Sequence, residues 1–352
     1  MKQLIRMMII TLLSFDPVIW LYLKFRDKSP RIIVYHGVSG RENEKRSSQV
    51  IADRVFRKQM AYLNKYFVNI PLDDVIKARA EGRALPRNAI TITFDDGYEN
   101  NYRFALPLLR ENGFSATFFV NPRHVEMAAK GQKIVLWWDV IDYLMKKENF
   151  RDFADIFQSC GIPVHNRRDF KKAKVEMEEK LKLTGAEQVE SIVSGMKNRF
   201  SEEIYNMPTP IIMDWDILIT MKKSGMLIGS HTMSHVNSAS LPRDRYHQEF
   251  VESKNILKKQ LGDEIDTFAF PFGGAAHYSP GSLQAVKDAK YKCALLVLSA
   301  KDEENDPFCL NRTAIQKDDN FNAFKVKTSG IYDDLKIWFR RVISLRPARG
   351  KK

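Results

Sequence analysis

The sequence predicts an α/β fold in which parallel strands alternate with helices, closed in the manner of a barrel. Short apolar, β-branched runs recur along the chain, and amphipathic helical stretches that end at a glycine separate several of them. Polar, reactive side chains directly follow several of these runs. That placement is expected where parallel strands end together at one ligand-binding face.

The first half of the chain contains a strand–helix–strand unit. Residues 31–38 (RIIVYHGV) are expected to form a short buried strand, and residues 53–66 have helical spacing that would pack on it. Residues 89–94 (AITITF) are β-branched, and a helical stretch through Leu109 leads to a further strand at 115–120 (SATFFV). This order predicts parallel pairing with a right-handed crossover.

The second half repeats the alternation. Glycines end two of its helical stretches, as a stop signal does. The expected helices span 214–224, 243–261 and 282–289, and they lead into strands at 226–232 (MLIGSHT), 267–274 (TFAFPFGG) and 292–299 (KCALLVLS).

Three segments do not follow this alternation of strands and helices. Residues 1–28 form an apolar amino-terminal segment, and residues 331–352 form a basic, amphipathic tail; the main domain is 29–330. Within it, residues from about 146 to 212 are a highly charged helical insertion. The insertion is either a set of solvated helices or a lid over the substrate cleft. The tail suits an interfacial helix on anionic lipid or a solvated basic extension.

The amino-terminal segment has the length of a membrane span. Residues 7–25 are nearly all apolar, close to the roughly 20 residues that cross a bilayer. However, Asp16 and Pro17 interrupt the stretch, and no cleavage site of a signal peptide follows. A kinked span, a re-entrant or interfacial helix, and a first core helix remain open. We expect association with a membrane of the bacterial inner type, on a side that flanking charges do not fix.

Net charge and cysteine content indicate which class of partner and which cellular compartment to expect. The formal charge of +13 indicates an anionic partner, but zinc-finger spacing and aromatic–basic signatures of nucleic-acid binding are absent, so a membrane surface is favoured. Three widely spaced cysteines, Cys160, Cys293 and Cys309, do not form a disulfide framework. They favour a reducing compartment, and hence the cytoplasmic face of the membrane.

Two adjacent carboxylates, Asp95 and Asp96, follow the strand at 89–94 and precede Gly97. Burying both without a cation is costly, because each raises the pKa of the other. A metal offsets this cost if one carboxylate binds it and the other stays free as a base. The alternative is a solvated Asp-Gly turn.

Two histidines four residues apart, His231 and His235, follow the strand at 226–232. Imidazoles at this spacing can face one centre and suit zinc or a related divalent metal; otherwise they are surface loop residues. With Asp96 they would supply three ligands and leave a position open for water. That coordination is typical of a catalytic zinc site.

The motifs together resemble those of the polysaccharide deacetylases of carbohydrate esterase family four, from about residue 31 to 312. The matching stretches are Thr93-Phe94-Asp95-Asp96-Gly97, His231-Thr-Met-Ser-His235 and Phe270-Pro271-Phe272-Gly273. Tyr35-His36-Gly37-Val38 is closer to the poly-N-acetylglucosamine deacetylase branch. The resemblance implies a distorted (β/α) barrel.

The resemblance also implies a role for each motif residue. Asp95 would be the general base acting on a metal-bound water, and Asp96, His231 and His235 would hold the metal, commonly zinc. The backbone N–H of Phe272 would help to form the oxyanion hole.

Two departures from the family pattern leave questions open. The arginine that often precedes the third-motif proline is missing from Phe268-Ala269-Phe270-Pro271, and Leu310-Asn311-Arg312 replaces the late Leu-x-His motif that supplies the general acid. His36 is our candidate acid, although it could instead pack against and orient Asp95. His277 is a weaker alternative.

The expected function is removal of an N-linked acetyl group from an amino sugar, in a polysaccharide or a lipid-linked glycan. An O-acetyl polysaccharide esterase with the same metal and base is one alternative. A non-catalytic glycan-binding protein on the same scaffold is another. Trp137-Trp138-Asp139 could supply a sugar-stacking platform or could be buried packing.

Overall fold

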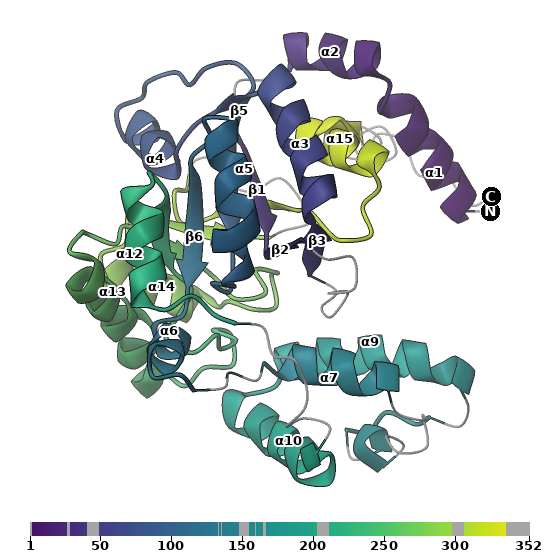
Figure 1. Ribbon diagram of the computed structural model, residues 1–352, viewed down its shortest axis with the longest axis vertical. Helices are drawn as coiled ribbons and strands as arrows, with labels where there is room; N and C mark the ends of the chain where they lie inside the picture. The colour runs from purple at the N-terminus through teal and green to yellow at the C-terminus, as the bar shows by residue number, and fades with distance from the viewer. Residues whose placement is uncertain are drawn as a thin grey trace, which may run out of the picture.

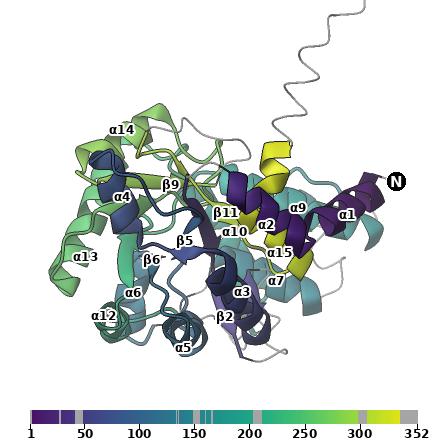
Figure 2. The same cartoon turned by 90° about the horizontal axis from the view of Figure 1, so that it is seen from above.

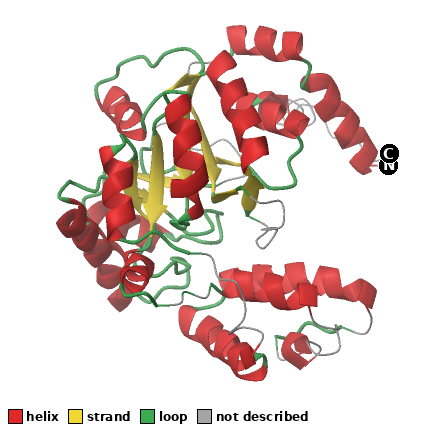
Figure 3. Ribbon diagram, viewed as in Figure 1, coloured by secondary structure: helices red, strands yellow, loops and turns green. Residues whose placement is uncertain are grey.

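The computed structural model describes residues 2–26, 29–40, 49–132, 134, 136–147, 155–158, 160–164, 167–202, 211–297 and 306–335. Its centre is a parallel sheet that closes into a distorted (β/α) barrel, as predicted (Figures 1 and 3). Strand order is β10-β9-β8-β7-β6-β5-β1-β11, and β4 pairs with β5 beside this path. The basic tail beyond residue 335 lies outside the described residues.

The strands of this sheet are short, and neighbours pair in parallel. They are β1 (Arg31–Tyr35), β4 (Val68–Asn69), β5 (Ala89–Phe94), β6 (Ala116–Val120), β7 (Leu227–Ser230), β8 (Thr267–Ala269), β9 (Cys293–Leu296), β10 (Leu310–Asn311) and β11 (Thr313–Ala314). A second sheet pairs β2 (Gly37–Ser39) with β3 (Val50–Ala52).

Helices surround the strands in the view down the barrel (Figure 2). They include α3 (Asp53–Tyr66), α4 (Leu72–Ala80), α5 (Leu106–Glu111), α6 (Pro122–Ala129), α12 (Trp215–Lys223), α13 (Ser253–Leu261), α14 (Pro280–Asp288) and α15 (Phe321–Ser329). The helix expected at 243–261 is divided: a 3₁₀ turn at Arg243–Arg245 and a π-helical turn at His247–Glu252 precede α13. Another π-helical turn, Asn101–Ala105, precedes α5.

Strand β5 is the centre of the core and carries the paired carboxylates at its end. All six of its residues are buried, as expected for a strand covered on both faces of a parallel sheet. Phe94 stacks on Phe118 of β6 at 4.7 Å between ring centroids, and it pairs in register with Tyr35 of β1. This packing fixes the end of β5 and therefore the position of Asp95, the next residue.

The barrel is closed by five consecutive residues. Strands β10 and β11 are separated by Arg312 alone, yet they lie at opposite ends of the strand order. The Arg312 N–H donates to Leu296 of β9 at 2.9 Å, and the Ile315 N–H donates to Val34 of β1 at 3.0 Å. Arg312 therefore lies where the two edges of the sheet meet.

Two helices precede the barrel, α1 (Lys2–Leu13) and α2 (Asp16–Phe25). In the described residues no single helix is long and apolar enough to cross a bilayer; the pair together passes on length and composition, with a bend of 70°. Ile19 and Leu23 of α2 are buried in the main core, and both helices contact α15. Figure 1 shows them at the end of the barrel away from the insertion.

The insertion is folded against the carboxyl end of the barrel. It contains α7 (Trp137–Lys147), α9 (Arg167–Leu183) and α10 (Ala186–Arg199). Buried side chains form a core of its own, among them Phe157, Phe170 and Met177, so its helices are packed together beneath their charged faces. The Asn237 side chain donates to the Lys182 carbonyl at 2.5 Å and ties α9 to the loop after β7.

Candidate active site

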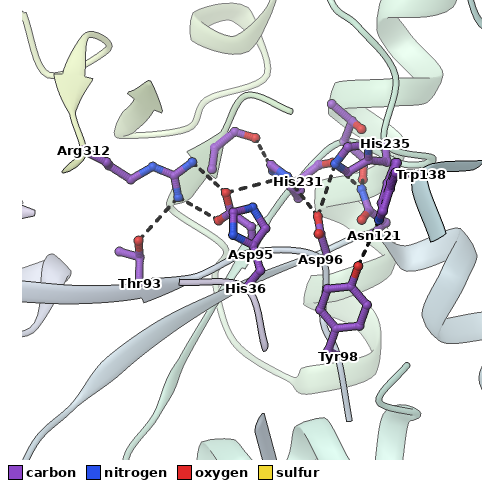
Figure 4. Close-up of polar contacts among 12 residues, drawn as sticks. His36, Thr93, Asp95, Asp96, Tyr98, Asn121, Trp138, His231, His235 and Arg312 are labelled. Atoms are coloured by element: carbon purple, nitrogen blue, oxygen red, sulfur yellow. Dashed lines mark hydrogen bonds and ion pairs between the residues drawn. The ribbon is translucent and has the colours of Figure 1, made fainter. Parts of the chain in front are cut away.

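The structure brings together the three side chains proposed as metal ligands. Asp96 follows β5, and His231 and His235 lie in the loop that follows β7. One ligand atom from each residue lies within 4.8 Å of the others. His235 Nε2 is 3.2 Å and His231 Nε2 is 3.7 Å from Asp96 Oδ1 (Figure 4).

The hydrogen bonding of this group fits a bound cation. Asp96 Oδ1 is buried and accepts no hydrogen bond from the residues that the structure describes. His231 Nδ1 lies 2.7 Å from the Ala269 carbonyl, to which it donates when it carries the ring proton. The lone pair of His231 is then on Nε2, which faces Asp96, as in metal-bound histidines oriented by a carbonyl.

The protonation states also fit a divalent cation. Burial lowers the pKa of His231 to about 4, so its imidazole is neutral at pH 7. Burial opposes ionisation of Asp96, but the close contact with His235, together with His36 and His231, outweighs it and lowers the pKa of Asp96. One carboxylate and two imidazoles are a donor set that suits zinc and related divalent metals.

Asp95 faces a different partner. Arg312 Nη1 and Nη2 donate to its two carboxylate oxygens at 2.7 and 2.8 Å, and the Arg312 side chain is fully buried. Burial favours the neutral acid, yet the charge of Arg312, followed by that of His231 and the Arg312 hydrogen bonds, holds the pKa of Asp95 below its usual value. Asp95 is therefore an ionised carboxylate beside the three-residue group.

Arg312 was not among the site residues predicted from the sequence. In the sequence it ends Leu310-Asn311-Arg312, the stretch in place of the late histidine motif. In the folded chain it supplies the guanidinium that the third motif lacks. The available signal was an arginine within an otherwise uncharged stretch, Leu310 to Ile315.

His36 lies at the end of β1 beside both carboxylates (Figure 4). Its charge contributes to the lowered pKa of Asp95 and of Asp96. The Asn101 side chain donates to the His36 carbonyl at 2.6 Å, which holds the backbone of this residue. The position suits both roles left open above, proton donation and orientation of Asp95.

Backbone strain is concentrated at the site. Six non-glycine residues of the described chain have φ between 59° and 71°, and four of them are Asp96, Thr232, His235 and Phe272. Left-handed backbone costs a non-glycine residue about 1–3 kcal/mol and persists where the surrounding structure enforces it. The packing therefore fixes the orientation of the second aspartate, the second histidine and Phe272.

Aromatic side chains enclose His235. The Phe272 ring is perpendicular to its imidazole at 4.9 Å between centroids, and the Trp138 ring lies at 4.7 Å. Trp138 is buried, donates to the Tyr98 hydroxyl at 3.0 Å and also lines the pocket beside His235. The Phe272 N–H has no acceptor among the described residues. The His277 Nδ1 accepts from the Gly274 N–H at 3.1 Å and closes a turn.

A pocket of about 300 Å³ opens beside His235 and Phe272, between α6 and the insertion. Trp137 and His124 line it, although the sequence had suggested no role for His124. The signal for His124 was its place in the first turn of α6, the helix that begins two residues after the carboxyl end of β6. The wall is part apolar and part polar. Its apolar residues include Met127, Ile134, Leu136, Leu181, Val189, Val193 and Val236, and Arg123, Lys182 and Glu190 add charge.

The same fold is found in several solved structures. A de-N-acetylase from Aggregatibacter actinomycetemcomitans has a TM-score of 0.57 at 16% identity, covering 85% of this chain and 99% of that one. IcaB from Ammonifex degensii gives 0.56 at 16%, covering 86% and 98%. Streptococcus pyogenes deacetylase PplD gives 0.54 at 17%, covering 82% and 92%. At these identities the likeness concerns the fold.

No curated protein matches the sequence. The model of the polysaccharide deacetylase family matches residues 82–163 and 178–294, more than half of the chain. The matched residues include both carboxylates, both histidines and Phe272. The chain therefore belongs to the polysaccharide deacetylase family, hydrolases that act on the carbon–nitrogen bond of acetylated glycans.

Proposed function

We propose that this protein hydrolyses the N-acetyl group of an amino sugar, with Asp95 as general base and a divalent cation, zinc by preference, on Asp96, His231 and His235. One observation carries the proposal. The two adjacent carboxylates have different partners, because Arg312 binds Asp95 while the histidines face Asp96. Asp95 is thus kept apart from the cation ligands, where it can act as a base next to the cation site.

Each residue then has a defined task. Asp95, ionised beside Arg312, takes the proton of the attacking water. The Phe272 N–H, which has no acceptor in the part of the chain that the structure describes, donates to the oxygen that gains negative charge. His36 gives a proton to the departing amine, which leaves as the free amino sugar while acetate is released. When bound, the cation supplies Lewis-acid chemistry: it lowers the pKa of water and polarises the carbonyl.

The pocket beside His235 is our proposed site for the sugar. Its volume of about 300 Å³ and its mixture of apolar and polar walls suit a hexosamine, whose ring has both apolar and hydroxyl surfaces. Trp137 lines this pocket and gives an aromatic surface for the ring. The sugar would belong to a polysaccharide or a lipid-linked glycan close to a membrane surface.

Metal analysis combined with acetate release tests this function. Wild-type protein should bind about one divalent ion per chain and release acetate from N-acetylated chitooligosaccharides. Asp95→Asn should keep the metal and lose most turnover, whereas His231→Ala should lose both. His247→Ala is the matched control, because the His247 side chain is exposed.

Two results would contradict the proposal. Full activity of Asp95→Asn would show that Asp95 is not the general base. An unchanged metal content in His231→Ala would show that His231 does not hold the cation. Release of acetate from O-acetylated but not N-acetylated glycans would assign the site to the esterase alternative.

A further inference from the structure

The amino-terminal helices expose an apolar surface that the proposed function does not use. Thirteen large apolar side chains of the described chain are exposed, and eight of them lie between residues 7 and 25. Leu12 is 69% exposed and Phe25 is 74% exposed. The eight, which we name the amino-terminal apolar surface, are Met7, Met8, Ile9, Leu12, Phe15, Trp20, Leu21 and Phe25.

The opposite side of the same helices is attached to the barrel. Ile19 and Leu23 are buried in the main core. Lys325 of α15 forms an ion pair with Asp16 and donates to the Ser14 carbonyl at 3.0 Å. Because these contacts occupy one side of α2, only its outer side is available to a partner.

Exposed cations lie beside the apolar surface. The acids near it are already engaged by the protein, because Asp16 forms an ion pair with Lys325 and Asp334 accepts a hydrogen bond from the Tyr22 hydroxyl. Lys24 Nζ lies 5.2 Å from the centre of the Trp20 ring, and exposed Lys65 and Arg87 lie next to α2. An apolar surface edged by lysine, arginine and tryptophan is the chemistry that binds anionic phospholipid at the headgroup level.

The attachment point is at the amino end of the barrel strands. Arg87, two residues before β5, donates to the Lys24 carbonyl at 2.8 Å, and Arg31, the first residue of β1, donates to Lys327 of α15 at 3.0 Å. His36 and Asp95 follow the other ends of the same two strands. The site and the apolar surface are thus separated by at least the length of β5, about 20 Å.

We propose that α1 and α2 dock on an anionic phospholipid bilayer along its surface, with the active site opening away from the lipid. Resting on the proposed function, this orientation assigns the substrate class: a glycan long enough to extend from the membrane, rather than a single amino sugar on a lipid carrier. Surface docking differs from a bilayer span, because the inner side of α2 remains packed against the barrel and does not enter the lipid.

Vesicle sedimentation of the full-length protein tests the docking. Wild type should sediment with phosphatidylglycerol-containing vesicles and much less with phosphatidylcholine alone. Leu12→Gln combined with Phe25→Gln should weaken binding about ten-fold or more. The matched control, Val68→Gln with Val175→Gln, removes two exposed apolar side chains elsewhere and should bind like wild type.

Two outcomes would overturn the docking. One is sedimentation of the docking variant equal to wild type. The other is a wild-type dimer without lipid that this variant converts to a monomer, since the surface would then bind a second copy of the chain. Acetate release from soluble chitooligosaccharides should be the same in the variant and wild type. If wild type releases none, the proposed function fails while the sedimentation result still decides docking.

Lipid-anchored glycans of increasing length test the orientation. On vesicles, wild type should deacetylate an anchored oligosaccharide at least about ten-fold faster than an anchored single N-acetylglucosamine, because the short substrate cannot reach the site. The docking variant should lose this preference. Equal rates on both substrates with vesicle-bound wild type would overturn the orientation.

Discussion

Arg312 binds both carboxylate oxygens of Asp95 across 217 residues of sequence, at 2.7 and 2.8 Å. Arg312 is also the residue that separates β10 from β11, where the edges of the barrel meet. The base is therefore held in place by the closure of the barrel itself. A bidentate arginine fixes both the charge and the plane of the carboxylate, which a point charge cannot do.

Replacing Arg312 should affect activity through Asp95. In Arg312→Lys, one charge remains but the two-point geometry is lost, and kcat/KM should fall about 100-fold. In Arg312→Gln the pKa of Asp95 should rise, because burial acts without the opposing cation. The acid limb of the pH profile of kcat/KM should then move to higher pH, since the base must be ionised.

Measurements of unfolding free energy distinguish the role of Arg312 in holding Asp95 from a purely structural role. Arg312→Gln leaves a buried carboxylate unpaired and should cost about 3–5 kcal/mol of unfolding free energy. Arg312→Lys retains the charge, so its loss of stability should be smaller while its turnover is still impaired. An unshifted pH profile in a folded Arg312→Gln protein would show that Arg312 does not set the ionisation of Asp95.

The sequence predicts most of the barrel and less of the site's surroundings. Strands such as β5 and β6 are long and apolar enough to be recognised, and the motifs follow directly from their ends. Strands β10 and β11 have two residues each, too few for any periodicity to show. Because those strands place Arg312, its contact with Asp95 could not be predicted.

Long-range packing explains the other gaps. The charged insertion has its buried residues spread among many charges, so its own core was not evident from composition. His124 is remote in sequence from every motif, and only the fold brings it to the pocket beside His235. In residues 1–28 the sequence left three alternatives open. Asp16 and Pro17 begin α2 in the structure, and the bend precedes them.

His36 can be tested as general acid by varying the leaving group. An amide needs a proton on the departing nitrogen, whereas an aryl ester such as p-nitrophenyl acetate does not. His36→Ala should therefore lose about 10²–10⁴-fold on the amide and much less on the ester. Equal losses on both substrates would indicate that His36 orients Asp95 instead. His247→Ala again serves as the control.

Substitutions of Phe272 distinguish a role of its backbone N–H group from a role of its aromatic ring. Its φ of 62° is strained for any residue but glycine, so Phe272→Gly should be more stable than Phe272→Ala by about 1 kcal/mol in urea unfolding. Both variants keep the N–H group and lose the ring beside His235. Turnover by Phe272→Gly should stay within about ten-fold of wild type, far less than the loss of a true oxyanion donor. A larger loss of kcat in Phe272→Gly would mean that the ring itself is required.

His124 predicts a pH dependence of stability. Burial lowers its pKa from 6.5 to about 4 in the folded protein. Between these values the unfolded chain binds a proton that the folded chain does not, so stability falls as pH drops from about 6.5 to 4, by up to about 3 kcal/mol. Below pH 4 both states are protonated and this contribution stays constant. His124→Gln should therefore flatten the decline of the urea midpoint over this range in metal-free protein. A decline as steep as that of wild type would show that His124 is not neutral in the folded state at pH 5.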